Sequence, residues 1–258
     1  MRILFIGDIV GQPGRKIVAR HLQRLVSTND VDVVIANAEN AAAGFGITPA
    51  IGQELLGLGI ALLTSGNHVW DKKEAEAYLK IEGRILRPAN YPDEVPGNGK
   101  SILRVRDQLL GVVNLQGRAF LPPIDCPFKA ADRELAELKR VTDIIVVDFH
   151  AEATAEKQAF GWYLDGRVSA VLGTHTHVQT ADERILPGRT AYVTDVGMTG
   201  PRDSVIGIRQ EDAIPKFLTQ MPRKFIVADG PTQLSAVLVD IGDAGRASAI
   251  QRMQIVDE

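Results

Sequence analysis

The sequence lacks three features that would place it outside the ordinary globular proteins. Its 258 residues include one cysteine, Cys126, so no internal disulfide can form. No apolar run approaches the ~18 residues of a membrane-spanning helix, and the first strand follows Met1 so closely that we expect no signal peptide. The formal net charge of -3 leaves no basic footprint for duplex nucleic acid. We therefore expect a cytoplasmic protein that binds neither a membrane nor duplex nucleic acid.

The composition that is present is that of a folded chain. Hydrophobic residues make up 45% and charged residues 24%, which is close to the average of globular proteins. The sequence contains no visible internal repeat or low-complexity tract. We therefore expect residues 1–258 to form a single domain.

Short apolar strands alternate with segments of helical periodicity along most of the chain. Val18, Leu22 and Leu25 recur at helical spacing after a loop at 11–14. Thr48 and the proline after it predict a helix N-terminus, and 71–74 reads as a capping box that starts another helix. Further helical spacing follows Phe128, and a helix-terminating turn is expected at 165–166.

Two regions interrupt this alternation and decide the fold class. Residues 88–99 read as a loop, and 102–105 with 110–115 predict antiparallel strands. Strands are also predicted at 190–194, 233–241 and 247–255. An all-parallel doubly wound sheet therefore fits less well than an α/β fold built as a four-layer α/β/β/α sandwich of two mixed sheets.

Side chains able to bind a metal follow five of the predicted strands. Asp8 follows the strand at 3–6, and Glu39 and Asn40 follow the strand at 31–36. Asn67 and His68 follow the strand at 60–63, His150 follows that at 144–147, and His175 and His177 follow that at 168–172. In open α/β sheets the ligand crevice lies beyond the carboxyl ends of the strands, so these side chains are expected to converge.

Each of these signals has a plain alternative when it is taken alone. The two histidines of 173–177 could be solvated, Glu39 with Asn40 could cap a helix, 66–68 could be turn chemistry, and His150 could be a packed core residue. Their joint occurrence at strand ends, all with nitrogen or oxygen ligands, predicts a metal site. His21 lies inside the first predicted helix without such company and is interpreted as a surface or packing residue.

The ordered set resembles the motifs of the calcineurin-like metallophosphoesterases. The resemblance rests on Asp8, the acidic residue at the second strand end, 66–68, His150 and 173–177. The sequence of 7–11, 37–40 and 194–201 is closer still to the YmdB-type bacterial phosphodiesterases, and this likeness covers nearly the whole chain. That subfamily is associated with hydrolysis of 2′,3′-cyclic nucleotides.

The resemblance implies a binuclear site with one shared ligand. The first metal would be held by Asp8, Glu39, Asn40 and His177, and the second by Glu39, Asn67, His150 and His175, with Glu39 bridging. The usual Asp-x-His opening is here Asp8-Ile9-Val10, so Asn40 is the candidate for the missing ligand. His68 would remain free as the catalytic proton donor. A homo-oligomer is also expected from the resemblance, whereas no substrate-binding residue is assigned.

The ligand chemistry favours an anionic phosphodiester substrate. Two carboxylates offset only part of the charge of two divalent ions, and such a pair makes hydroxide available near neutral pH for attack on phosphorus. Nitrogen and oxygen ligands suit iron or manganese, as divalent or mixed-valence ions, with magnesium or zinc as alternatives. We expect a small substrate such as 2′,3′-cAMP.

Two other functions compete with a phosphodiesterase. An amidohydrolase also uses a His-x-His pair and two metals, but there the pair usually lies on the first strand of an eight-fold barrel, and here it comes late in the chain. A regulatory protein could use the same metal site to sense a nucleotide. The presence of His68 beside the complete ligand set favours turnover.

Overall fold

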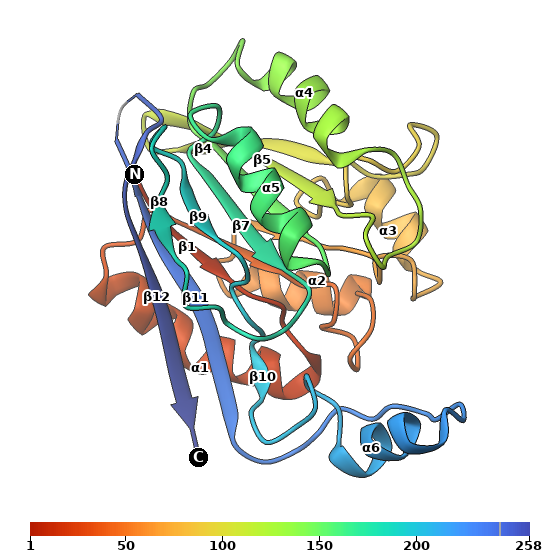
Figure 1. The fold of residues 1–258 in the computed structure, drawn as a ribbon. Helices are drawn as coiled ribbons and strands as arrows, with labels where there is room; N and C mark the ends of the chain where they lie inside the picture. Colours follow the sequence, from red (N-terminus) through yellow and green to blue (C-terminus); the bar gives the residue numbers. More distant parts are fainter. Residues whose placement is uncertain (243) are drawn as a thin grey trace.

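Two mixed sheets and six helices make up residues 1–242 and 244–258, the part of the chain that the computed structural model describes (Figure 1). The first sheet contains β1 (Arg2–Ile6), β2 (Val33–Asn37), β3 (Leu62–Thr64), β10 (Gly200–Pro201), β11 (Thr232–Ile241) and β12 (Ala247–Asp257). The second contains β4 (Lys100–Val105), β5 (Gln108–Gln116), β6 (Ile145–His150), β7 (Ala170–Thr174), β8 (Arg184–Ile185) and β9 (Ala191–Val193). The helices are α1 (Gly11–Thr28), α2 (Pro49–Gly57), α3 (Ala75–Ile81), α4 (Pro127–Leu138), α5 (Thr154–Leu164) and α6 (Gln210–Thr219).

Each sheet has a parallel centre and antiparallel additions. Strands β1, β2 and β3 run parallel in the first sheet, and β5, β6, β7 and β9 run parallel in the second. Strand β11 pairs antiparallel with β1, β10 and β12, and β4 pairs antiparallel with β5 as the sequence predicted. The parallel centres bring the carboxyl ends of β1, β2 and β3 to one edge, and those of β6 and β7 to another.

Three apolar clusters define the layers. Alternate residues of a strand face opposite sides, so Leu4 of β1 packs with helices α1, α2 and α3 while its neighbour Ile3 lies between the sheets. In the same way Val147 of β6 packs with α4 and α5, and Val146 packs between the sheets. The predicted four-layer α/β/β/α sandwich is therefore confirmed. This arrangement differs from the eight-fold barrel that the amidohydrolase alternative requires.

Two helix starts differ from the sequence prediction. Residues 11–14, predicted as a loop, already form the first turn of α1, where a proline costs little because its missing N–H would have no helical partner. Gly14 is needed there because a Cβ atom would lie 2.3 Å from the carbonyl oxygen of Thr199. Helix α3 begins only at Ala75, and Asp71 does not cap it, because the Asp71 carboxylate binds His68 instead.

Helix α6 was not predicted from the sequence, and it contains Pro215, a residue that usually ends or kinks a helix. It lies to one side of the layers, at the end of the molecule where β10 is found (Figure 1). Within the described residues, no helix combines the length and the apolar character needed to cross a membrane.

Candidate metal centre

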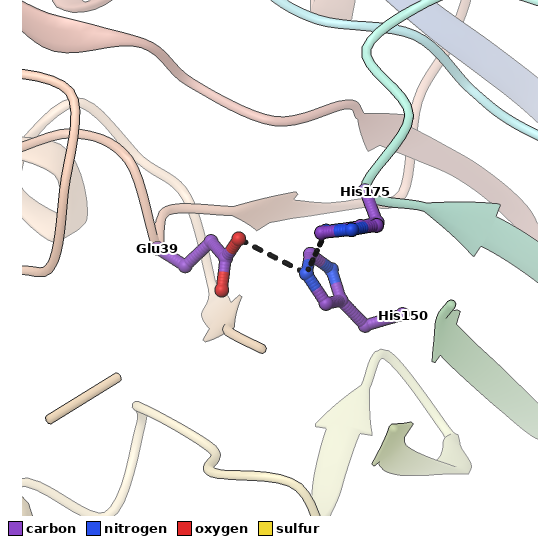
Figure 2. Close-up of side chains that lie close together, drawn as sticks. All are labelled: Glu39, His150 and His175. Atoms are coloured by element: carbon purple, nitrogen blue, oxygen red, sulfur yellow. Dashed lines mark hydrogen bonds and ion pairs between the residues drawn. The ribbon is translucent and has the colours of Figure 1, made fainter. Parts of the chain in front are cut away.

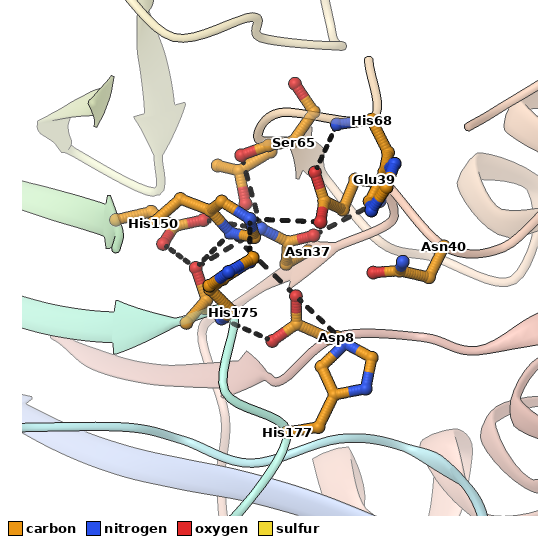
Figure 3. A network of polar contacts seen from close by, with 12 residues as sticks. Asp8, Asn37, Glu39, Asn40, Ser65, His68, His150, His175 and His177 are labelled. Carbon is orange, nitrogen blue, oxygen red and sulfur yellow. Dashed lines mark hydrogen bonds and ion pairs between the residues drawn. The ribbon is translucent and has the colours of Figure 1, made fainter. Parts of the chain in front are cut away.

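The predicted ligands meet at the carboxyl ends of strands from both sheets. Asp8 follows β1, Glu39 and Asn40 follow β2, and Asn67 and His68 follow β3, while His150 ends β6 and His175 and His177 follow β7. Figure 3 shows the carboxylates and imidazoles from these separate elements turned toward one another. The convergence expected from the strand endings is present, with His68 at the margin of the cluster.

Four side chains form what we call the His150 half of the centre: Glu39, Asn67, His150 and His175. The Nε2 atom of His150 lies 3.0 Å from Glu39 Oε1 and 3.0 Å from His175 Nδ1 (Figure 2). It also lies 3.1 Å from Asn67 Oδ1. Ligand atoms of Glu39, His150 and His175 all lie within 4.8 Å of one another. This mixture of imidazole nitrogens and carboxylate and amide oxygens suits a borderline divalent ion.

The charges of the His150 half favour a cation at its centre. Burial alone would lower the pKa of His150, yet the carboxylates of Glu39 and Asp8 raise it to about 9. Burial would raise the pKa of Glu39, but the adjacent His150 lowers it to about 2. Burial and the charge of His150 lower the pKa of His175 to about 2, so His175 is neutral and offers a lone pair. The proton on His150 Nε2 is thus close to acceptor atoms of Glu39, Asn67 and His175.

The remaining predicted ligands, Asp8, Asn40 and His177, form what we call the Asp8 half. Asp8 Oδ1, Asn40 Oδ1 and the nearby Glu39 Oε1 are buried and have no hydrogen-bond partner among the described residues. Burial raises the pKa of Asp8. A buried oxygen without a partner costs about 1–3 kcal/mol, and an ion is one of the few explanations for several such atoms at one place.

His177 completes the Asp8 half through its tautomer. Its Nδ1 donates to the carbonyl oxygen of Ile206 at 2.9 Å, which leaves the lone pair on Nε2. That Nε2 lies 4.0 Å from Asp8 Oδ1. Two ligand atoms that are each about 2.0–2.2 Å from one ion can be up to about 4.4 Å apart. The residues of the Asp8 half therefore fit a metal ion.

A buried relay orients the ring of His150. The hydroxyl of Thr174 accepts from His150 Nδ1 at 2.9 Å and donates to Asp148 Oδ1 at 2.7 Å. Asn37 donates to the other oxygen of Asp148 at 3.0 Å, and burial raises the pKa of Asp148 to about 6. Such outer partners fix the tautomer and direction of a ligating imidazole. Sequence reasoning missed Asp148 and Thr174, although both lie within strands that end in ligands.

The loop that carries His175 and His177 is held in an unusual backbone conformation. Their φ angles are +101° and +66°, so the pair does not continue β7 as an extended segment. Such angles cost non-glycine residues about 1–3 kcal/mol each and persist when the surroundings enforce them. Here the enforcing contacts come from a buried ion pair, because Lys157 Nζ donates to Asp195 at 2.6 Å and Asp195 accepts from the backbone N–H of Thr176 at 3.0 Å.

His68 is placed beside the ligands without joining them. Its backbone N–H donates to Glu39 Oε2 at 3.0 Å, and its ring Nδ1 lies 2.7 Å from Asp71 Oδ2. The ring also meets Phe45 edge-on, with 4.9 Å between the ring centroids. Asp71 was read from the sequence as a helix cap, and the structure instead makes it the partner of His68. Its spacing of three residues from His68 is the signal that could have found it.

Gly66 is required by packing and not by turn conformation. A Cβ atom at this position would lie 2.0 Å from Cδ2 of the His150 ring. The glycine therefore lets the strand end of the first sheet approach a ligand of the second sheet. The turn-chemistry interpretation of 66–68 does not explain this contact.

Comparisons with known proteins agree with this geometry. A family model described as "YmdB-like protein" matches residues 4–253. The chain is 51% identical, over 259 residues, to a Bacillus subtilis (strain 168) protein named 2′,3′-cyclic-nucleotide 2′-phosphodiesterase, and the match covers 100% of this chain and 98% of that protein.

Two solved structures are similar over almost their whole length. A hypothetical protein from Thermus thermophilus has a TM-score of 0.94 and 44% identity, covering 100% of both chains. A protein of Mycoplasma pneumoniae described as a novel phosphatase has a TM-score of 0.93 and 35% identity, covering 99% of this chain and 93% of that one.

Proposed function

Because the chain belongs to the YmdB-like family, we propose that it is a binuclear metal-dependent phosphodiesterase that hydrolyses 2′,3′-cyclic nucleotides such as 2′,3′-cAMP. The observation that carries the proposal is the group of buried oxygens without partners beside the cluster around His150 Nε2. A buried site of this composition needs cations, and a cationic site recruits an anionic substrate.

The predicted ligands would divide between two ions, with Glu39 shared. Asp8, Asn40 and His177 would hold one ion, and Asn67, His150 and His175 the other. When bound, two divalent ions supply activated water near neutral pH and offset the charge of the phosphate. Asn40 takes the place of an imidazole ligand, since its amide nitrogen donates to the Gly44 carbonyl at 3.0 Å and its oxygen is left free.

His68 supplies the proton that the leaving oxygen needs. Its Nδ1 faces Asp71, so the Nε2–H of the imidazolium is the group available to a substrate beside the metal ligands. The contact with the Asp71 carboxylate fixes the orientation of the ring. Proton transfer of this kind typically contributes about 10²–10⁴-fold to the rate.

A cyclic phosphodiester suits this arrangement. Its single negative charge matches a site whose positive charge is largely offset by Asp8 and Glu39, and strain in the five-membered ring lowers the activation that is needed. Addition of water breaks one ring P–O bond, and the released ribose oxygen takes the proton, which gives a nucleoside monophosphate.

Hydrolysis by metal-reconstituted protein tests the proposal directly. The protein is stripped of metal, reloaded anaerobically with Mn²⁺ or Fe²⁺, and incubated with 2′,3′-cAMP while the products are separated by chromatography. We expect metal-dependent formation of adenosine monophosphate. Hydrolysis of simple phosphomonoesters without any hydrolysis of cyclic or linear diesters would overturn the proposal.

A further inference from the structure

An apolar cavity of about 170 Å³ opens beside the metal centre. One side is formed by ligands of both halves, and the other by Phe45, Phe217 and Phe225 together with aliphatic side chains of 205–213. Three of the chain's eight phenylalanines therefore gather at one small cavity. An apolar cavity of about 150 Å³ is large enough to hold a benzene ring, so this one has room for a flat aromatic group.

The cavity walls are tied to the metal centre by specific contacts. Ile206 accepts the hydrogen bond of the ligand His177 through its carbonyl oxygen, and Gly44 does the same for the ligand Asn40. Phe45 contacts the ring of His68. A molecule whose phosphate lies on the metal ligands would therefore place its neighbouring group against this wall.

The outer wall is built by helix α6 and the segment that follows it. Ala213 and Phe217 are four residues apart, so they lie on one face of α6, and both line the cavity. The segment after α6 returns to the core, with Arg209 N–H donating to Ile226 at 3.0 Å and Ala228 N–H donating to Gly207 at 2.9 Å. Phe217 is 73% exposed although it lines the cavity. It is thus free to cover a bound group.

From this juxtaposition we propose that the cavity is the subsite for the nucleobase of the substrate, with Phe217 as a specificity-determining residue. The inference rests on the proposed function, because it assumes a phosphate on the metal ligands. The side of the cavity opposite the metal ligands has no charged side chain, so it favours an uncharged group attached to the phosphate. Aromatic side chains bind any base by stacking. A nucleotide combines these two properties in one small molecule.

Helix α6 offers a matched control for Phe217. Leu218 is the next residue and is 79% exposed, but it does not line the cavity. Leu218→Ala therefore removes a comparable exposed apolar side chain without changing the subsite. Phe217→Tyr keeps an aromatic ring and serves as the conservative variant.

The first test compares 2′,3′-cAMP with glycerol 1,2-cyclic phosphate, which has the same cyclic diester but no base. We expect wild type to prefer the nucleotide in kcat/KM, and Phe217→Ala to reduce that preference by about tenfold through KM, which is typical of a lost base-stacking ring. Phe217→Tyr and Leu218→Ala should keep it. An unchanged preference, or equal losses on both substrates in Phe217→Ala, would overturn the subsite.

A binding measurement separates failure of the subsite from failure of the proposed function. Calorimetry on Mn²⁺-loaded protein should show that Phe217→Ala weakens adenosine 3′-monophosphate by about tenfold while inorganic phosphate is unaffected. This result would support the subsite even if wild type failed to hydrolyse cyclic nucleotides. Equal affinities of wild type and Phe217→Ala for adenosine 3′-monophosphate would overturn it even if hydrolysis were observed.

Discussion

The two halves of the metal centre differ in what their ligand atoms contact. In the His150 half, Glu39, Asn67 and His175 each place a side-chain atom within 3.1 Å of one imidazole nitrogen, His150 Nε2. In the Asp8 half, the ligand oxygens of Asp8 and Asn40 have no hydrogen-bond partner among the described residues. The side chains of the first half are therefore gathered around one imidazole nitrogen, whereas the oxygens of Asp8 and Asn40 have no such common partner.

The halves also differ in how their imidazoles are held. His150 is oriented by the buried hydroxyl of Thr174 inside the second sheet. His177 is oriented by the carbonyl of Ile206. Ile206 belongs to the segment that leads to α6 and lines the cavity. The Asp8 half is therefore coupled to the part of the molecule that we propose meets the substrate, and the His150 half to the core.

The largest effect is expected when the predicted ligand that both halves share is removed. Glu39→Gln should empty both metal positions and reduce activity by more than about 10³-fold, since loss of one electrostatic contributor alone can cost that much. Elemental analysis and hydrolysis of 2′,3′-cAMP check this. Glu134→Gln alters another buried glutamate, which pairs with Lys100 away from the centre, and should keep both metals. A Glu39→Gln protein with full metal content would contradict the shared role.

Loss of the proton donor should leave both halves loaded and remove only chemistry. His68→Ala should reduce hydrolysis of 2′,3′-cAMP by about 10²–10⁴-fold, and by much less for a nitrophenyl diester whose leaving group needs no proton. His21→Ala, which changes a histidine paired with Asp257 far from the ligands, should have no effect on either substrate. Equal losses of His68→Ala on good and poor leaving groups would show that His68 acts in some other way.

Asn40 separates the two halves. Asn40→Ala should weaken only the Asp8 half, because the His150 half keeps all four of its ligands. One metal per chain is then expected, with activity that recovers in part when the metal concentration is raised. Asn40→Asp keeps a ligand oxygen and should retain two metals. If Asn40→Ala bound two metals as tightly as wild type and turned over normally, Asn40 would be a capping residue only.

A smaller effect on the His150 half is expected when a residue that only contacts a predicted ligand is changed. Thr174→Val removes the hydroxyl that orients His150 and should weaken metal binding there by about 10–100-fold, the usual cost of losing an outer partner. Thr190→Val is the control, because that buried hydroxyl binds the Val168 carbonyl at 2.7 Å and contacts no ligand. Equal metal affinities in the two variants would contradict the relay through Thr174.

The sequence was sufficient for most strands of the two sheets, but not for the short strands β8 and β10, and for the convergence of the predicted ligands. Apolar runs marked the strands, because a strand packed on both faces must be apolar at nearly every position. Strand β2 is an example, since all its residues before the final Asn37 are apolar. That these ligand side chains converge could be predicted because the carboxyl ends of parallel strands share an edge, which requires no knowledge of side-chain contacts.

What could not be predicted depends on partners that the local pattern does not reveal. Asp71 has the pattern of a helix cap, and only the position of His68 shows that its carboxylate is used elsewhere. Lys157 occupies a helix as a surface lysine would, yet it is buried by its pair with Asp195, 38 residues away. The proposed role of Phe217 could not be predicted, because the sequence does not show the cavity that this exposed residue lines.

The measurement that tests the account most directly is the number of metal ions bound per chain. Anaerobic reconstitution followed by elemental analysis should give two for wild type. At a metal concentration 100 times the dissociation constant, each independent site should stabilise the fold by about 2.7 kcal/mol, so chelation should lower the Tm. Absence of bound transition metal after reconstitution, together with an unchanged Tm, would contradict the assignment of these residues as a binuclear centre.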